Sequence, residues 1–393
     1  MPSSLAKAET IPDCTKPSFR KITVAHLMPS SVIGGAETAT LRMTAATASQ
    51  FRHVAVCPPE AVALRQLFEQ QGTETLAYAA PTPSLRHFVR FYKESLTIAH
   101  TIQAVGADIV HFADKFAAYR GSLAAVLART RLVCHIRLSH PHLTWRDRLS
   151  LWPVDSFIFV SKDAQKTFHL SLPDKKARVI YDAIEVSDAD MTESTVAVRR
   201  ELGVPAGSIL VGMVARVAPQ KDFFTLAAAA AQVLRKHPDT RFLVVGEHSV
   251  VESHRNHYEQ VLRRLNELGI ADRFIFTGHR DDVPRLIAAM DIAVLCTHRE
   301  GFGLVVAESM AYRKPVIATA VGGVLDIIQP GVNGYLHQHG DSEELARAIV
   351  SLIEHPDHRK RIGDAGYEHV RNSYSRQIFV EDITKAYSDV MRN

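Results

Sequence analysis

The chain has 393 residues, 46% of them hydrophobic and 22% charged, and its formal net charge is +4. This is the composition of an ordinary soluble globular protein, long enough for two domains with full cores. No apolar run is long enough to cross a bilayer, which excludes a membrane-spanning protein. Residues 1–20 lack the apolar centre of a secretory signal, so we expect a loose leader there.

The chain has four cysteines, and they are far apart: Cys14, Cys57, Cys134 and Cys296. None of them forms a CxxC pair. This spacing argues against a disulfide framework or a zinc site, and it favours a reducing cytoplasm as the location of the protein.

Short runs rich in valine and isoleucine alternate with amphipathic, helix-like runs along the first half of the chain. The predicted strands are 21–27, 52–58, 107–112, 131–136, 156–161 and 177–182. Such alternation predicts βαβ units and a parallel sheet covered by helices on both faces.

The same alternation of strand-like and helix-like runs begins again in the second half. The predicted strands there are 208–216, 241–247, 273–278, 292–297, 315–319 and 334–337. The polar and acidic residues 185–200 lie between the two series, and we interpret them as a linker and the start of a second domain. A last helix, 376–391, comes after both series and is expected to pack back across the first domain.

We therefore expect an α/β fold with two Rossmann-like, doubly wound parallel-sheet domains that face a central cleft. The expected parts are a leader over 1–20, an N-terminal acceptor domain over 21–187, a C-terminal donor domain over 188–372 and a crossing helix over 373–393. Ligands are expected at the carboxyl ends of the strands. No GxGxxG follows the first strand and no GxxxxGK[ST] is present, so a nicotinamide or flavin fingerprint and a P-loop are excluded.

Glu300 and Glu308 flank "GFGLVVA", a stretch that should be buried. A desolvated, unpaired carboxylate costs on the order of several kcal/mol. Either both glutamates therefore face solvent, or a ligand needs them there. A helix starting near Gly303 offers free N–H groups to a diphosphate, and Glu308, about one and a half turns on, can accept from both ribose hydroxyls. From periodicity alone, the simpler interpretation is favoured: an exposed loop acid and a helix-surface acid.

Two further stretches follow the first strand of each predicted domain. Gly34 and Gly35 let backbone N–H groups approach a bulky ligand, although many βα turns contain such a pair. Arg216 and Lys221 lie on one connection and suit phosphate oxygens, although two solvated loop cations are common.

Polar residues also mark strand ends in the first half. His111, His135 and Arg137 are candidates for contacting a sugar or polarising a reacting oxygen, although a lone strand histidine is more often structural. Ser161 and Asp182 are interpreted as caps of the helices or turns that follow them.

Taken together, these stretches resemble the GT-B retaining glycosyltransferases, in particular family 4, the glycosyl transferases group 1. The motif "EGFGLVVAESMA" resembles the family signature "EGFGLxxxEAMA", and "GMVARVAPQKD" resembles its "GRLxxxKG" loop. Likewise "TGHRDDVPRLIAAMDIAVLCT" resembles "GxVxxxxxxxxYxxADxxVxPS", "GGAET" resembles "GGAER", and "VIYDAIEV" resembles "VIPNGVD". The resemblance covers about residues 20–390 in the family's order, and the twin-glutamate stretch is its most specific part.

The resemblance implies a nucleotide-diphosphate sugar bound mainly by the C-terminal domain. The implied donor-binding residues are Gly34, Gly35, His111, His279, Arg280, Phe302, Gly303, Leu304, Val305 and Glu308. The implied catalytic residues are Arg216, Lys221, Glu300, His135 and Arg137. Among these, Glu308 would hold the ribose, Arg216 and Lys221 the diphosphate, and Glu300 would face the donor sugar. The backbone near His279 and Arg280 would meet the base.

Some positions depart from the family pattern. Asp222 replaces the usual glycine after the loop lysine, Asp182–Ala183 replaces Asn-Gly, and "GEHS" (246–249) lacks the usual second glycine. The family's donor-facing histidine aligns with His135 by identity, whereas the alternative alignment of "HIR" places Arg137 there. Both alignments remain open.

The implied reaction is transfer of a sugar, with retention of configuration, to an acceptor hydroxyl. Arg216, Lys221 and the helix start at Gly303 would stabilise the departing nucleoside diphosphate. These cations take the place of a metal, and no DxD segment follows a strand as a ligand pair, so we expect neither a metal nor another cofactor. No covalent intermediate is expected, and domain closure would exclude water.

Residues 81–152 hold 10 basic and 4 acidic residues, with aromatic side chains among them in "LRHFVRFYKESL" and "LTWRDRLSLW". Two interpretations are equally supported: a basic-aromatic face resting on an anionic membrane, or an ordinary helix and surface loop. The expected partners are a nucleotide-sugar donor and a sugar, lipid-linked or small-molecule acceptor, without nucleic acid. The expected location is the cytoplasm, with peripheral contact at the inner face of the membrane under the first interpretation.

Two rival functions remain at this point. One is another GT-B enzyme, a phosphorylase or a nucleotide-sugar epimerase. The other is a non-catalytic nucleotide-sugar-binding protein, against which the presence of Arg216, Lys221, Glu300 and Glu308 argues. The donor base, the sugar, the acceptor and the oligomeric state are not set by these motifs.

Overall fold

The computed structural model describes residues 20–28, 33–78, 83–84, 86–186 and 192–392. Most of the predicted leader, Cys14, the predicted domain boundary at 187–188 and part of the linker lie outside the described residues.

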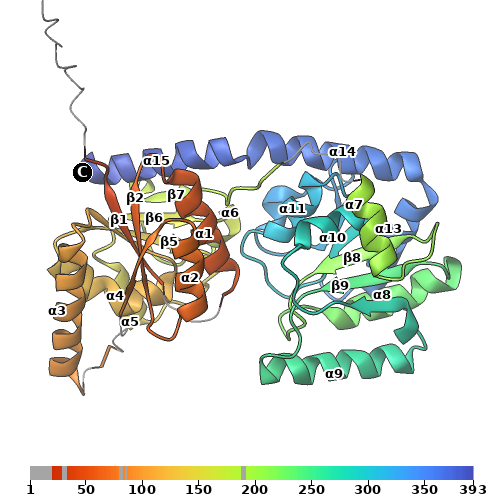
Figure 1. The fold of residues 1–393 in the computed structure, drawn as a ribbon, viewed down its shortest axis with the longest axis horizontal. Coiled ribbons are helices and arrows are strands. Elements are labelled where there is room, and N and C mark those ends of the chain that lie inside the picture. Colours follow the sequence, from red (N-terminus) through yellow and green to blue (C-terminus); the bar gives the residue numbers. More distant parts are fainter. Residues whose placement is uncertain (1–19, 29–32, 79–82, 85, 187–191, 393) are drawn as a thin grey trace, which may run out of the picture.

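The first half of the chain contains a seven-stranded parallel sheet (Figure 1). Its strands are β1 (Thr23–Leu27), β2 (Arg52–Cys57), β3 (Glu74–Ala77), β4 (Ile109–Phe112), β5 (Arg131–Ile136), β6 (Ser156–Phe159) and β7 (Ala177–Val179). Its helices are α1 (Gly35–Thr47), α2 (Val62–Gln70), α3 (Phe88–Ala104), α4 (Lys115–Leu127), α5 (Trp145–Leu151) and α6 (Lys162–Lys166). A short 3₁₀ helix, η1 (Asp174–Lys176), precedes β7.

The second half contains a six-stranded parallel sheet. Its strands are β8 (Leu210–Val214), β9 (Arg241–Val245), β10 (Phe274–Phe276), β11 (Ile292–Leu295), β12 (Val316–Thr319) and β13 (Tyr335–His337). Its helices are α7 (Thr192–Glu201), α8 (Phe223–Lys236), α9 (Glu252–Glu267), η2 (Ala271–Arg273), α10 (Val283–Ala289), α11 (Leu304–Ala311), α12 (Val324–Ile327), α13 (Ser342–Glu354) and α14 (Pro356–Ser373).

The strand orders are β3-β2-β1-β4-β5-β6-β7 and β10-β9-β8-β11-β12-β13. In each sheet the chain starts near the centre, moves to one edge and then returns to build the other side. The order therefore reverses beside β1 and β8, which is where doubly wound sheets bind ligands. The predicted α/β fold with two doubly wound parallel sheets is confirmed.

The last helix, α15 (Arg376–Arg392), returns to the first sheet after α14 has run along the second half (Figure 1). Its buried side chains, Phe379, Ile383 and Tyr387, join a core cluster with Val24 of β1 and Ile109 of β4. α1 covers the same face, since its Met43 belongs to that cluster. The chain's C-terminal segment is thus part of the core of its N-terminal half.

Helices also cover the remaining faces. α4 packs between α3 and α5 beside the first sheet, α7 packs against α10, and α8 packs against α13. Within the described residues, no helix is long and apolar enough to cross a membrane. Cys57, Cys134 and Cys296 are buried free thiols.

Candidate active site

The loop after β11 is seated against the end of β5 in the other half of the chain. A Cβ atom built on Gly301 would stand 2.1 Å from the carbonyl oxygen of Arg137. A side chain does not fit at this distance, so glycine is needed for the two backbones to approach. The contact places Glu300, one residue earlier, where the two sheets face each other.

Gly303 ends this loop and is the N-cap of α11. Its φ of 101° is left-handed, a conformation that favours glycine. The N–H groups of Leu304 and Val305 in the first turn have no backbone acceptor among the described residues. A helix start with free N–H groups suits an anionic ligand, because the aligned peptide dipoles add partial positive charge there.

Lys221 and Glu300 form an ion pair beside this helix start. The Lys221 Nζ atom lies 2.8 Å from Glu300 Oε2, and the two side chains are 21% and 22% exposed. An antiparallel bridge between Lys221 and Thr297 ties together the connections that follow β8 and β11. A partly exposed pair of this kind contributes about 1 kcal/mol or less to stability, so its main effect is to position two charged groups.

Arg216 lies on the same connection as Lys221, five residues earlier. Its side chain is exposed, and it forms no ion pair with any residue that the structure describes. A free guanidinium offers a fork of donors suited to phosphate oxygens.

Glu308 is paired with a residue from the other half of the chain. The Arg42 guanidinium on α1 lies 2.7 Å from Glu308 Oε1 on α11. The Glu308 side chain is 21% exposed and that of Arg42 is 39% exposed. Glu300 and Glu308 therefore each have a cationic partner, which resolves how two carboxylates are accommodated next to an apolar stretch. No sequence pattern pointed to Arg42, because its partner is 266 positions away.

The turn before α1 carries Gly34 and Gly35 as expected, but its N–H groups are partly occupied. The Glu37 carboxylate accepts a hydrogen bond from the Gly34 N–H at 3.0 Å. Burial raises the pKa of Glu37. Gly35 is exposed. A ligand anion at this turn would share the helix start with an acidic side chain.

His111 and His135 belong to a row of four buried histidines on one face of the first sheet, with His26 and His53. His26 Nε2 lies 2.9 Å from His53 Nδ1, and the His111 ring lies 5.2 Å from that of His26 and 5.5 Å from that of His135. His111 Nδ1 is 2.5 Å from the hydroxyl of Tyr387 on α15. All four rings are buried, so none of them is open to solvent.

Burial disfavours the charged form of each imidazole and lowers the pKa of all four. The pKa of His53 falls to about 4 and that of His111 to about 3. For His26 and His135, burial again lowers the pKa, and the nearby Arg137 guanidinium lowers it further. The row is therefore neutral at physiological pH.

Arg137 and Asp182 form a buried ion pair with an N–O distance of 3.0 Å, and each side chain is 8% exposed. Arg137 also donates to His135 Nδ1 at 3.2 Å. Of the two expected caps, Ser161 caps α6 by accepting from the Ala164 N–H, whereas Asp182 pairs with Arg137 instead. The structure links both candidates for the donor-facing position, His135 and Arg137, in one buried chain.

Phe302 packs in an aromatic cluster where the two halves meet. Its ring centroid is 5.6 Å from that of Tyr181 and 5.3 Å from that of Tyr374, and the side chain is 3% exposed. The Tyr374 hydroxyl donates to the Asp326 carbonyl, and the Asp326 carboxylate accepts from the Lys162 N–H at 2.6 Å. Phe302 is thus a core residue that anchors the loop.

His279 and Arg280 lie beyond β10, apart from the Lys221–Glu300 pair. His279 is exposed, with Nε2 3.3 Å from Asp281. Arg280 is held by Asp282 and Glu201, each at 2.7 Å. Those carboxylates raise the pKa of Arg280. The Arg280 side chain is fully engaged, which leaves the backbone of this segment as the part open to a ligand.

The contacts therefore join some of the expected site residues and not others. Lys221 meets Glu300, His135 meets Arg137 and stacks with His111, and Gly301 joins the loop of Glu300 to the backbone of Arg137. A cavity of about 600 Å³ lies elsewhere, at the amino ends of β1 and β2, lined by residues that include Arg20 and Arg52. It is not adjacent to the candidate active site.

Two family models match the chain. Residues 33–188 match Glycosyltransferase Family 4, and residues 196–369 match Glycosyl transferases group 1. N-acetyl-alpha-D-glucosaminyl L-malate synthase of Bacillus anthracis is 26% identical over 306 residues, which are 77% of each chain. D-inositol 3-phosphate glycosyltransferase of Thermomonospora curvata is 34% identical over 182 residues, 44% of this chain and 41% of that one. Several other curated relatives are likewise matched over only about half of their length.

Solved structures share the fold across nearly the whole chain. HepE of Anabaena, solved in complex with UDP-glucose, superposes with a TM-score of 0.81 at 24% identity, over 93% of this chain and 99% of that one. The lipopolysaccharide outer core galactosyltransferase WaaB superposes with a TM-score of 0.70 at 16% identity, over 94% and 99%. The sequence matches and the shared architecture agree, and the chain belongs to the family 4 glycosyltransferases of GT-B fold.

Proposed function

We propose that this chain is a retaining glycosyltransferase that transfers a sugar from a UDP-sugar to an acceptor hydroxyl. The observation that carries the proposal is the placement of the Lys221–Glu300 pair next to the free N–H groups at the start of α11. The cation and the helix start suit a diphosphate, and the neighbouring carboxylate suits the hydroxyls of a sugar attached to that diphosphate.

In this proposal, the donor lies along the carboxyl ends of β8 and β11. Lys221 and Arg216 bind the diphosphate together with the amides of Leu304 and Val305. Glu308 accepts from the ribose hydroxyls, and Glu300 from hydroxyls of the donor sugar. UDP is the preferred nucleotide because the fold neighbour HepE was solved with UDP-glucose and with UDP. A GDP-sugar is the alternative donor.

The difficult step is the departure of the nucleoside diphosphate from an oxocarbenium-like centre. Negative charge develops on the diphosphate, and Lys221, Arg216 and the start of α11 stabilise it. The bond from the anomeric carbon to the diphosphate breaks while a bond to the acceptor oxygen forms on the same face. The departing phosphate oxygen takes the acceptor proton, so the step needs neither a protein nucleophile nor a Mg²⁺ ion.

His135 and Arg137 border this site from the first half of the chain. The backbone of Arg137 touches the loop of Glu300 through Gly301. The buried Arg137–Asp182 pair fixes that backbone, so we assign Arg137 a positioning role. His135 accepts a hydrogen bond from Arg137 and His111 stacks behind it, so we assign His135 a role in holding the Arg137 side chain.

A donor screen tests the proposal. We expect a UDP-sugar to raise the melting temperature more than GDP-, ADP- or TDP-sugars do, and we expect turnover by that donor. The anomeric configuration of the product, read by NMR, is expected to match that of the donor. Adding Mg²⁺ or Mn²⁺ to EDTA-treated protein should leave turnover unchanged. Tight donor binding without transfer or hydrolysis would favour a nucleotide-sugar-binding protein, and phosphate-dependent cleavage would favour a phosphorylase.

For the acceptor, we propose a cell-envelope or lipid-linked substrate in the cytoplasm. Two relatives are a capsular polysaccharide glycosyltransferase of Staphylococcus aureus and a lipopolysaccharide core glycosyltransferase of Rhizobium meliloti. On α5 and just after it, Trp145, Leu149 and Trp152 are 60%, 64% and 82% exposed, with Arg146 and Arg148 between them. Exposed aromatic and basic side chains on one helix suit the interface of an anionic membrane.

Vesicle co-sedimentation tests this contact. We expect binding to vesicles with anionic lipid and little binding to neutral vesicles. The variant Trp145→Ser/Trp152→Ser should lose binding, whereas Val250→Ser, at an 80% exposed position of the second half, should keep it. Equal sedimentation with both lipids, or binding that survives in the tryptophan variant, would remove the membrane from the proposal.

A further inference from the structure

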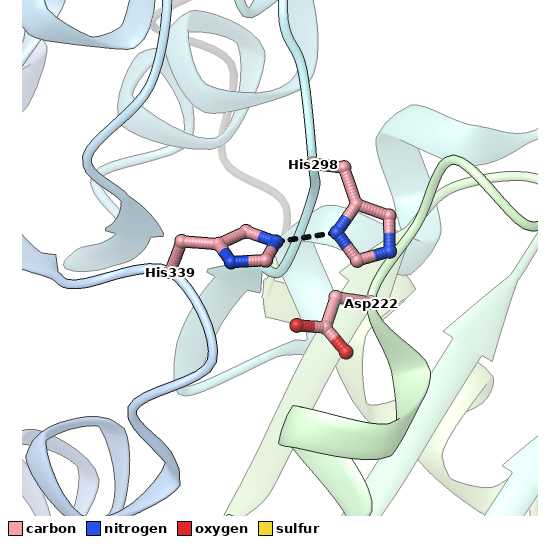
Figure 2. Close-up of side chains that lie close together, drawn as sticks. All are labelled: Asp222, His298 and His339. Atoms are coloured by element: carbon pink, nitrogen blue, oxygen red, sulfur yellow. Dashed lines mark hydrogen bonds between the residues drawn. The ribbon is translucent and has the colours of Figure 1, made fainter.

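Three loops of the second sheet bring two histidines and an aspartate together (Figure 2). Asp222 ends the connection from β8 to α8, His298 follows β11, and His339 follows β13. One ligand atom from each residue lies within 4.8 Å of the others. Asp222 is buried, and the two histidines are exposed. The sugar-transfer mechanism proposed above assigns no role to these three side chains.

The two imidazoles point their nitrogens at one another. His298 Nδ1 and His339 Nε2 face each other within hydrogen-bonding reach, and the ring centroids are 4.7 Å apart (Figure 2). Only one of the two nitrogens can hold a proton in such a contact, so at least one ring presents a lone pair. In the tautomers that carry their protons on the outer nitrogens, His298 Nδ1 and His339 Nε2 both offer a lone pair to one cation.

Asp222 completes the set of ligands without giving up its helix cap. Its Oδ1 accepts from the Thr225 N–H at 3.0 Å, and its Oδ2 accepts from the Thr225 hydroxyl at 2.6 Å. An ionised carboxylate has about four lone-pair sites, so each oxygen can still bind a cation. This residue stands where the resemblance to the family predicts glycine, so it adds a charge that the resemblance does not account for.

A fourth imidazole lies close by on α9. His257 is 7% exposed, and its Nε2 atom has no hydrogen-bond partner among the described residues. Its ring lies 5.5 Å from that of Phe224, which is two residues after Asp222 in the sequence. Burial lowers the pKa of His257, a hydrogen bond with the Lys221 backbone raises it, and the neighbouring His298 lowers it further. His257 is thus a buried imidazole beside the cluster.

We propose that Asp222, His298 and His339 form a binding site for one divalent transition-metal ion, with Zn²⁺ as the best-matched ion. Two imidazole nitrogens and a carboxylate oxygen are ligands that Zn²⁺ prefers, and water supplies the fourth position. Mg²⁺ and Ca²⁺ are poor occupants because they prefer sets of oxygen ligands. The cysteine spacing predicted no zinc site, and this one uses no cysteine.

The metal would join the two connections that carry the donor-binding charges. The His298 N–H donates to the Gln220 carbonyl at 3.0 Å, and Lys221 is bridged to Thr297. An ion held by Asp222 and His298 crosslinks the same two segments through side chains. The ion would therefore hold the loops of Lys221 and Glu300 together, and it would take no part in stabilising the leaving group.

Calorimetry with Zn²⁺ on EDTA-stripped protein tests the proposal. We expect one saturable site per chain. His298→Ala/His339→Ala should weaken binding at least about 100-fold, because ligands contribute more than the outer-shell groups whose loss costs about 10–100-fold. Asp222→Asn keeps an acceptor for the Thr225 N–H and should weaken binding about 10-fold. As a matched control, His142→Ala/His355→Ala removes two exposed imidazoles elsewhere and should bind Zn²⁺ like the parent protein.

One absorption measurement and one hydrogen-exchange measurement complete the test. Co²⁺ should give visible d–d absorption that the His298→Ala/His339→Ala variant lacks. Hydrogen exchange at residues 220–222 and 297–300 should slow when Zn²⁺ binds, and activity is not needed for either readout. The proposal is overturned if the parent protein shows no saturable Zn²⁺ binding, or if the double-histidine variant binds Zn²⁺ as tightly as the parent.

Discussion

Lys221 and Glu300 lie 79 positions apart in the sequence, and their side chains meet at 2.8 Å. Each follows a different strand of the second sheet, and the two strands, β8 and β11, are neighbours at the point where the strand order reverses. The pair therefore marks the ligand-binding end of that sheet, and it holds a cation ready for a diphosphate next to the start of α11.

The first prediction concerns Lys221. We expect Lys221→Ala to lower kcat about 100-fold or more, because one preorganised charge on the leaving group is removed. The melting temperature should change little, since the partly exposed pair contributes little to stability. Lys236→Ala, at the exposed end of the helix that follows, is the matched control and should retain full turnover. Near-normal kcat in Lys221→Ala would remove this residue from the site.

The second prediction concerns Arg216, which is exposed and unpaired among the described residues. Arg216→Ala should also lower kcat about 100-fold while leaving the free energy of unfolding unchanged within about 0.5 kcal/mol. Arg216→Lys should recover only part of the rate, because lysine lacks the bidentate fork. Full activity in the alanine variant would contradict the assignment.

The third prediction concerns Glu308 and its partner Arg42. Glu308→Gln should raise the donor KM about 10-fold with little change in kcat, because a charged acceptor of the ribose hydroxyls is lost. Arg42→Ala should instead leave the donor KM unchanged or lower it a few-fold, because the carboxylate no longer has a competing partner. Steady-state kinetics on both variants separates the roles. If Glu308→Gln does not raise KM, Glu308 does not bind the ribose.

The fourth prediction concerns the buried ion pair of Arg137 with Asp182. Arg137→Ala should destabilise the protein by about 3–5 kcal/mol, because it leaves a carboxylate buried without a partner. Arg137→Ala/Asp182→Ala removes both charges and should be less destabilised than the single variant. Urea unfolding of the three proteins measures the difference. A double variant that is as unstable as the sum of the two single variants would mean that the charges do not interact.

The fifth prediction concerns acid stability. The buried histidines have folded pKa values below the unfolded value of about 6.5, so the unfolded chain binds more protons than the folded one at lower pH. The stability that these neutral histidines contribute to the folded state is fully present above about pH 6.5. It is lost as the pH falls toward the folded pKa, which is about 4 for His53 and about 3 for His111. Each such histidine costs about 1.4 kcal/mol per pH unit within that window.

Urea unfolding at pH 7 and pH 5 checks this. The free energy of unfolding should fall by at least about 2 kcal/mol, and His53→Gln should reduce the fall. Equal stability at the two pH values would contradict the prediction. It would mean either that the four buried histidines are already charged in the folded protein at pH 7, or that they take up no protons on unfolding.

Most of the fold follows from local sequence patterns. Buried parallel strands are continuous apolar runs, and those over 131–136 and 241–247 predict β5 and β9 nearly to the residue. β3 (Glu74–Ala77) was not predicted, because it is an edge strand of half-exposed residues without an apolar run. The resemblance also located Lys221, Glu300 and the start of α11, which lie together in the structure.

The pairings were not predictable, because they join distant positions. Arg42 reaches Glu308 only when α1 faces α11, and Asp182 reaches Arg137 only when the end of β7 lies near the end of β5. The histidine row forms because His26 and His111 are direct neighbours in the register of β1 and β4. The Asp222–His298–His339 cluster likewise depends on three separate loops.

The most direct test is a crystal structure of the protein with UDP bound. We expect the diphosphate within hydrogen-bonding distance of Lys221 Nζ and the amides of Leu304 and Val305, with the ribose hydroxyls on Glu308. A complex in which UDP binds elsewhere, or in which Lys221 and Glu308 make no contact with it, would show that the proposed donor site is wrong.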